Sequence, residues 1–197
     1  MKKVVLLWVA LFGLLGVQRA EAQSWLDALK GVATEALDEV TGGKLTEVAI
    51  VGTWNYQAPG IRMGSSDTMT NLAGAAVEST IEGKLQGVYQ KVGFVPGFCS
   101  ITFEQGEAFT MTLKGKSIEG TYLFDAATHK IDLQIGKLKI PASGFVYMDG
   151  QNLELVFPAD KLVQFITAVG SRVSSLSTLA KSLENYDEVY CGFQFGK

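Results

Sequence analysis

The stretch that decides the fold is residues 98–157, FCSITFEQGEAFTMTLKGKSIEGTYLFDAATHKIDLQIGKLKIPASGFVYMDGQNLELVF. Apolar residues recur at every second position, as in Cys99, Ile101 and Phe103, with polar residues between them. A period of two is typical of strands that bury one face. Turn-forming pairs such as Asp149-Gly150 separate the runs. The stretch therefore predicts a meander of antiparallel strands joined by short turns.

Six strands are expected within this stretch, over residues 99–103, 109–113, 118–124, 131–140, 145–147 and 153–157. The fourth is long because its alternation continues past Gly136, with the phase shifted by one residue. An extra residue at a glycine is typical of a β-bulge, which bends a strand where a sheet closes. Pro141 is expected to end that strand.

The flanking segments complete the sheet and add helices. Residues 48–57 and 189–195 alternate in the same way and predict a first and a last strand. Helical periodicity predicts helices over 24–40, 68–91 and 160–183. Eight antiparallel strands with one apolar face commonly close into a barrel. We therefore expect a mainly β protein: an eight-stranded antiparallel up-and-down barrel sealed by its first and last strands. An N-terminal helix, a helix after the first strand and a helix before the last strand accompany it.

The N-terminus has the three parts of a secretory signal peptide. Met1-Lys2-Lys3 is a short basic region, Val4 to Val17 is an apolar run, and Ala20-Glu21-Ala22 is an A-x-A cleavage site. The apolar run is too short to span a bilayer comfortably. No cysteine follows the small residues, so no lipoprotein anchor is expected. The sequence predicts a signal peptide over 1–22, a single domain over 23–197 and a periplasmic or secreted location.

Charge argues against nucleic-acid and membrane partners. Removing Lys2, Lys3, Arg19 and Glu21 with the signal peptide leaves 14 basic and 19 acidic residues, a net charge of −5. Such a chain has no electrostatic attraction to nucleic acid or anionic lipid. An outer-membrane barrel is disfavoured because its strands need about 9–11 residues and an apolar outer face. We expect no nucleic-acid binding and no integral membrane insertion.

Cys99 and Cys191 are the only cysteines, and in an oxidising compartment such a pair is usually a disulfide. The bond would close a loop of 93 residues. The chain-entropy model gives such a loop about 4 kcal/mol of stabilisation. Two buried thiols that never meet are the alternative. A catalytic thiol is disfavoured, because the chain has no C-x-x-C motif and no histidine near either cysteine in sequence.

Catalytic and metal chemistry have little support in the sequence. His129 is the only histidine and lies in a predicted turn, where a solvated side chain is the simpler interpretation. Ser65-Ser66-Asp67 fits a helix N-terminus better than a reactive serine. Acidic pairs for glycoside chemistry are the remaining alternative, but the candidates occupy the polar phase of their strands and should point to water. These candidates are Glu104, Glu107, Glu119 and Asp125. We expect no enzyme, no catalytic residue, no metal and no cofactor.

Gly52-Thr53-Trp54 on the first predicted strand matches the Gly-x-Trp signature of the lipocalins. Together with the strand order and the helix before the final strand, it makes the chain resemble the lipocalin-like (calycin) group. More specifically, residues 23–197 resemble small exported lipocalin-like proteins of unassigned function from Bacteroidetes. The helices predicted over 24–40 and 68–91 depart from the lipocalin pattern. The resemblance implies that Trp54 packs across one end of a barrel whose interior accommodates a small apolar ligand.

The apolar phase of the strands supplies the candidate ligand-binding residues. The aromatic side chains expected to share the interior are Trp54, Phe103, Phe109, Tyr122, Phe124, Phe145, Tyr147 and Phe157, with Met111 and Phe193 in the same phase. An eight-stranded barrel is either filled by its own side chains or wide enough for one small ligand. One hypothesis is therefore a carrier that binds a small apolar ligand in the lumen, which a lumen cavity would favour. The other is a filled barrel that binds a protein partner or acts as an inhibitor, which an exposed apolar patch on the helices would favour.

Overall fold

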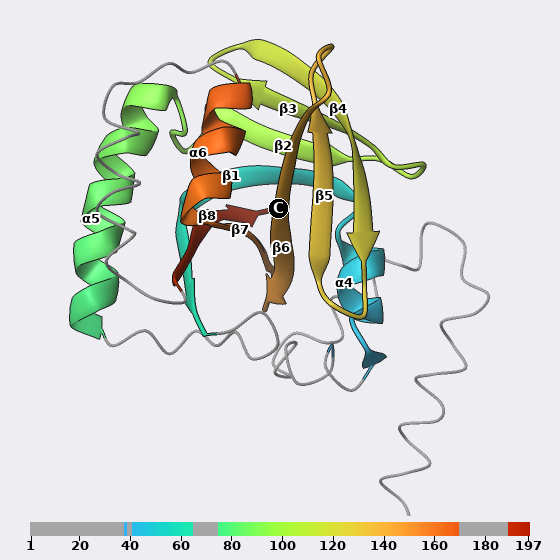
Figure 1. Ribbon diagram of the computed structural model, residues 1–197, viewed down its shortest axis with the longest axis horizontal. Helices are drawn as coiled ribbons and strands as arrows, with labels where there is room; N and C mark the ends of the chain where they lie inside the picture. Colours follow the sequence, from blue (N-terminus) through green and yellow to red (C-terminus); the bar gives the residue numbers. More distant parts are fainter. Residues whose placement is uncertain (1–37, 39–40, 65–74, 170–188) are drawn as a thin grey trace, which may run out of the picture. The chain divides into compact units, whose positions relative to one another are not determined.

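The computed structural model describes residue 38 and residues 41–64, 75–169 and 189–197 (Figure 1). The predicted signal peptide, most of the predicted helix over 24–40, and Ser65-Ser66-Asp67 lie outside these residues. The described elements are α4 (Lys44–Ala49), β1 (Gly52–Met63), α5 (Ala75–Val92), β2 (Cys99–Phe103), β3 (Ala108–Leu113), β4 (Lys116–Asp125), β5 (Lys130–Ile135), β6 (Ile140–Asp149), β7 (Asn152–Pro158), α6 (Ala159–Ala168) and β8 (Val189–Gly196).

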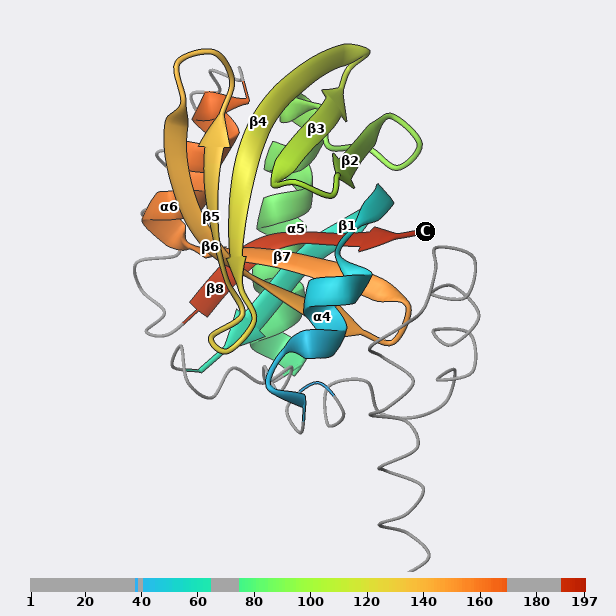
Figure 2. The ribbon, with the colours of Figure 1, turned by 90° about the vertical axis from the view of Figure 1, so that its right-hand side faces the viewer.

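The eight strands form a closed antiparallel barrel in which each strand pairs with its neighbours in the sequence. β8 returns to β1, with partners running from Asn55 opposite Gly196 to Met63 opposite Val189. Figure 2 shows β1, β7 and β8 running across the direction of β4, β5 and β6. The predicted up-and-down barrel, sealed by its first and last strands, is confirmed.

Alternation along each strand places apolar side chains inside the barrel. In β2, Cys99, Ile101 and Phe103 are buried, whereas the residues between them are half-buried. Directly opposed residues of neighbouring strands share a face. Because Phe103 lies opposite Phe109 and Phe109 lies opposite Gly120, the inward face continues from β2 through β3 to β4. The hydrophobic core is therefore the inside of the barrel.

The segment after β5 is a hairpin turn and not the predicted β-bulge. Ile135 lies opposite Ile140, and residues 136–139 form the turn between them. Gly136 and Lys139 both have positive φ angles, 68° and 49°, which this turn requires. Leu138 stands at the tip and is 85% exposed. Pro141 lies within β6, so the expectation that it ends a strand is also wrong. Leu138 misled the prediction because its spacing from Ile140 imitates strand alternation.

A short helix precedes the barrel where the sequence predicted the start of the first strand. Residues 44–49 form α4, and β1 begins at Gly52 instead of Val48. The side chain of Asp38 stabilises the start of α4, because its carboxylate accepts hydrogen bonds from the backbone N–H groups of Leu45 and Thr46. Val48 belongs to this helix despite its β-branched side chain, which favours strands.

β1 is longer than predicted and divides its pairing between two neighbours. Residues 52–55 pair with β2, whereas residues 55–63 pair with β8. A β-bulge between Tyr56 and Ala58 marks the change. This bulge, which the sequence did not predict, lies beside the junction that closes the barrel.

The helices α5 and α6 lie on one side of the barrel and α4 lies on the other (Figures 1 and 2). Leu85 and Tyr89 of α5 and Phe165 of α6 are fully buried. Phe165 stacks on the inward-facing Phe157, with ring centroids 4.8 Å apart. Both helices were predicted, although the parts expected before residue 75 and after residue 169 lie outside the described residues. Within the described residues, no helix has the length and apolar character needed to cross a membrane.

Candidate functional site

Strand register sorts the eight predicted ligand-binding residues onto two faces of the barrel wall. The inward face holds six of them, Trp54, Phe103, Phe109, Tyr122, Phe124 and Phe157. Phe145 and Tyr147 are on the outward face, because β6 buries Val146 and Met148 on its inward side. The prediction that all eight share the interior is therefore wrong for Phe145 and Tyr147.

The tight turn between β6 and β7 explains this correction. Asp149 lies opposite Asn152 across a two-residue turn, which places Met148 opposite Leu153 and Tyr147 opposite Glu154. Both phases of β6 are apolar at this point, so alternation alone did not distinguish them. Counting back from the turn would have assigned the faces correctly.

Ring contacts define two groups among the aromatic side chains of the interior, and Trp54, Phe124 and Phe157 belong to neither of them. In the first, the ring of Phe103 lies 4.9 Å from that of Tyr122 and 6.2 Å from that of Phe109. The hydroxyl of Tyr122 donates a hydrogen bond to the carbonyl oxygen of Glu104, at 3.0 Å. This first group is therefore packed, and its polar atom is satisfied within the protein.

The second group, which we call the Tyr56 cluster, comprises Tyr56, Tyr89, Phe94, Phe193 and Phe195. All five side chains are fully buried. The centroid of the Tyr56 ring lies 6.0–6.4 Å from each of the other four rings, and each contact is edge-on. Such edge-to-face pairs are favourable beyond the area they bury. The cluster joins β1 and β8 of the barrel to α5 and the residues that follow it.

The two tyrosines of this cluster differ in their hydrogen bonds. The hydroxyl of Tyr89 donates to the carbonyl oxygen of Gly192, at 2.9 Å. The hydroxyl of Tyr56 has no hydrogen-bond partner, and no other buried side-chain nitrogen or oxygen in the described part of the chain shares this condition. Burial raises the pKa of Tyr56 above its usual value, with smaller contributions from Cys99 and Glu82. The interior therefore contains a protonated, unpartnered hydroxyl among aromatic rings.

Sequence reasoning missed Tyr56 and Tyr89 as site residues. Tyr56 shares the phase of Trp54 on the first predicted strand, so the signal for an inward side chain was present. Tyr89 follows Leu85 by four residues on a predicted helix, which places both on one helical face. Neither pattern reveals whether a hydroxyl has a partner, because the Gly192 carbonyl that binds Tyr89 is distant in sequence.

Cys99 and Cys191 are free thiols, so the disulfide favoured from sequence is not formed in this structure. Cys99 lies opposite Leu113 of β3, whereas Cys191 lies between Ile61 of β1 and Phe157 of β7. Each cysteine thus fills an inward position on its own part of the wall. Burial raises the pKa of each thiol to about 12, so both thiols stay protonated and are poor nucleophiles at neutral pH.

The outward face of β1, β6 and β7 holds a buried ion pair. Nε of Arg62 donates to Oε2 of Glu154 at 2.5 Å, and both side chains are almost fully buried. The guanidinium of Arg62 also lies 4.0 Å from the centroid of the Tyr147 ring, a cation–π contact. Phe145 packs edge-on against Tyr190 nearby on the same face. The two corrected residues thus pack on the outside of the barrel wall.

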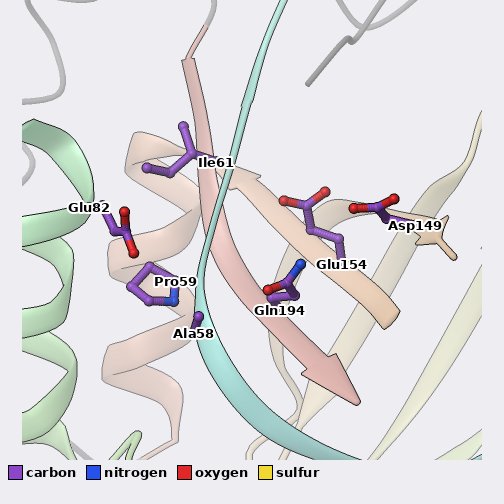
Figure 3. Close-up of a pocket in the computed structure, with 7 residues that line it drawn as sticks. All are labelled: Ala58, Pro59, Ile61, Glu82, Asp149, Glu154 and Gln194. Carbon is purple, nitrogen blue, oxygen red and sulfur yellow. The ribbon is translucent and has the colours of Figure 1, made fainter. Parts of the chain in front are cut away.

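A cleft of about 280 Å³ adjoins the part of β1 that pairs only with β8. Figure 3 shows Pro59, Ile61 and Glu82 on one side of β1 and Glu154 and Gln194 on the other, with Asp149 beyond them. The cleft is lined by Ala58, Pro59, Ile61, Glu82, Asp149, Glu154 and Gln194. Pro59 and Ile61 lie opposite the inward-facing Phe193 and Cys191, whereas Ala58, Glu154 and Gln194 are in the outward phase. The cleft therefore borders both faces of β1, and it is an open cleft and not the enclosed lumen cavity that the carrier hypothesis predicts.

The candidates for catalysis and metal binding that the structure describes do not assemble into a site. Glu104, Glu107, Glu119 and Asp125 are exposed, as their strand phase predicted. His129 lies in the predicted turn, but it is half-buried and not fully solvated. Its ring stacks on Tyr147 with centroids 4.8 Å apart. Within the described residues, no three acidic, histidine or cysteine side chains converge closely enough to hold a metal ion.

An eight-stranded up-and-down barrel with an inward tryptophan on its first strand defines a lipocalin-like protein. The chain belongs to the family described as "Lipocalin-like domain (DUF4923)", whose match covers residues 27–197. It is also similar to the crystal structure of a DUF4847 family protein from Bacteroides vulgatus ATCC 8482, with 17% identity and a TM-score of 0.39. That match covers 77% of this chain and 96% of the other. No curated protein matches the chain.

Proposed function

We propose that this protein binds a small, mainly apolar ligand inside the barrel, at the Tyr56 cluster. The observation that supports the proposal is the Tyr56 hydroxyl, which is fully buried and has no hydrogen-bond partner. Leaving a buried hydroxyl unsatisfied costs about 1–3 kcal/mol, and native proteins leave few such groups. A ligand oxygen that hydrogen-bonds Tyr56 removes this cost. The four aromatic rings around Tyr56 favour an apolar body.

The packing of the cluster limits the size of the ligand. Phe94 and Phe193 have ring centroids 4.3 Å apart, and Tyr89 stacks on Phe193 at 4.7 Å. A ligand therefore enters this region by displacing rings from their present contacts, and a small molecule displaces fewer of them.

The alternative is a filled barrel that acts through its surface on a protein partner. The density of ring contacts in the interior favours this second function. A protein that binds a partner through its surface is also expected to have an exposed apolar patch on its helices. Among the helix residues whose side chains the structure describes, Val48 of α4 is the one large apolar residue that is exposed. We retain ligand binding as the proposal because of the unpartnered hydroxyl of Tyr56.

Native mass spectrometry of protein purified gently from its own cells tests the proposal. A stoichiometric extra mass that is lost on denaturation supports a carried ligand. The same measurement on the Tyr56→Phe variant should show less of this mass, because the variant lacks the hydroxyl that holds the polar group. A bare mass for the wild-type protein, at several expression levels and from several growth conditions, would refute a carrier function and favour a protein partner. We further propose that the protein acts in the periplasm or outside the cell, after removal of residues 1–22.

A further inference from the structure

The inward face of the barrel carries almost no charge. Lys116 is the one charged side chain at an inward strand position in the described part, and it is exposed at the end of β4. The buried charged residues Arg62 and Glu154 face outward and pair with each other, and buried Asp38 lies before α4. The described inward strand positions thus offer hydroxyl and thiol groups but no buried counter-charge. The exposed carboxylate of Glu82 on α5 acts electrostatically on Tyr56, and its negative charge disfavours an anion there.

The remaining polar groups of the interior are neutral and mostly engaged. The hydroxyls of Tyr89 and Tyr122 donate to the backbone carbonyls of Gly192 and Glu104. The thiols of Cys99 and Cys191 are weak donors. Among the described residues, Tyr56 is the one buried side chain whose hydrogen-bonding oxygen has no partner.

A charged ligand is disfavoured in such a place. Moving a carboxylate or an ammonium group out of water without a partner of opposite charge is far more costly than moving a hydroxyl or carbonyl oxygen. A neutral hydroxyl or carbonyl oxygen loses less hydration free energy when it leaves water. One hydrogen bond to Tyr56 largely replaces the hydrogen bonds to water that this oxygen loses.

We propose that Tyr56 makes the barrel selective for neutral ligands with one hydroxyl or carbonyl oxygen, and against carboxylates of the same size. This inference rests on the proposed function, because it assumes that the ligand occupies the Tyr56 cluster. It excludes free fatty acids and aromatic acids as natural ligands, and it points to alcohols, phenols, ketones or esters.

Three probes with one carbon skeleton test the inference: toluene, benzyl alcohol and benzoate. Dissociation constants are measured by ligand-observed NMR titration at neutral pH, with the wild-type protein and with Tyr56→Phe and Tyr89→Phe. Tyr89→Phe is the matched control because it removes a hydroxyl from the same cluster, but one that is already satisfied by Gly192.

We expect benzyl alcohol to bind the wild-type protein at least tenfold more tightly than benzoate. Tyr56→Phe should weaken benzyl alcohol about tenfold, equivalent to about 1.4 kcal/mol, and leave toluene unchanged. Tyr89→Phe should not change the ratio of the benzyl alcohol and toluene affinities. Benzoate binding as tightly as benzyl alcohol, or equal effects of the two variants on benzyl alcohol, would overturn the inference and leave the proposed function intact. Failure of both toluene and benzyl alcohol to bind the wild-type protein would overturn the proposed function itself.

Discussion

Exchanging Tyr56 for phenylalanine should stabilise this protein, which is the reverse of the usual effect of removing a buried polar group. The variant deletes a hydroxyl that is fully buried and unpartnered. The desolvation of such a group costs about 1–3 kcal/mol, and the small gap left by one oxygen atom returns part of that. We expect the free energy of unfolding of Tyr56→Phe to rise by about 1 kcal/mol.

The matched exchange of Tyr89 should have the opposite sign. Its hydroxyl donates to the Gly192 carbonyl at 2.9 Å in the same aromatic cluster. Losing one hydrogen bond and leaving that carbonyl short of a partner lowers the free energy of unfolding by about 1 kcal/mol. Because the two variants delete the same atom from the same residue type, their difference of about 2 kcal/mol isolates the effect of the partner.

Urea unfolding followed by circular dichroism, on protein that has been unfolded and refolded to remove any bound molecule, measures both changes. For a chain of this size, 1 kcal/mol corresponds to about 2–4 °C in Tm, so thermal melts should show Tyr56→Phe above the wild type and Tyr89→Phe below it. If both variants lose stability equally, Tyr56 has a hydrogen-bond partner in solution. The main support for a ligand at this position would then be gone.

Three further predictions concern other parts of the chain. Ellman's reagent should detect no thiol in the folded protein and two after unfolding without reductant, since Cys99 and Cys191 are buried and unpaired; no thiol in either state would instead establish a disulfide. Glu154→Gln should destabilise the protein by about 3–5 kcal/mol in urea unfolding, because it removes the negative charge that the buried guanidinium of Arg62 binds at 2.5 Å, and a loss below 1 kcal/mol would contradict a buried pair. Intact mass of the exported protein should correspond to cleavage after Ala22, and a mass that retains the N-terminal residues would refute the predicted signal peptide.

Much of the barrel is predictable from sequence because its strands bury only one face. Where one phase was clearly polar, as with Ser100 and Thr102 beside Ile101, alternation assigned both the strand and its inward side correctly. Where both phases were apolar, as with Phe145 and Val146, alternation could not show which side chain faces the interior. There the turn between β6 and β7 sets the register, and the register shows that Val146 faces inward.

The candidate site was less predictable than the fold because its chemistry depends on contacts between distant segments. Trp54 and Phe157 were placed correctly inside the barrel from their own strands. Tyr56 is a candidate ligand-binding residue because its hydroxyl has no hydrogen-bond partner. The hydroxyl of Tyr89 is satisfied by the carbonyl oxygen of Gly192, which is on the final strand. Sequence patterns show which residues are buried, but not which polar atoms remain unsatisfied.

The pairing of β1 with β8 has a consequence for how the chain folds. Every other strand pair in the barrel joins elements adjacent in the strand order, and most of these are hairpins that form locally and fast. The β1–β8 contact brings together the two extremes of that order, so closing this large loop is entropically the most demanding step. Until it happens, β1 and β8 are open sheet edges that other chains can pair with. Aggregation should therefore compete with this final closure, and mutations that weaken the β1–β8 seam should lower the yield of folded protein more than their effect on equilibrium stability suggests.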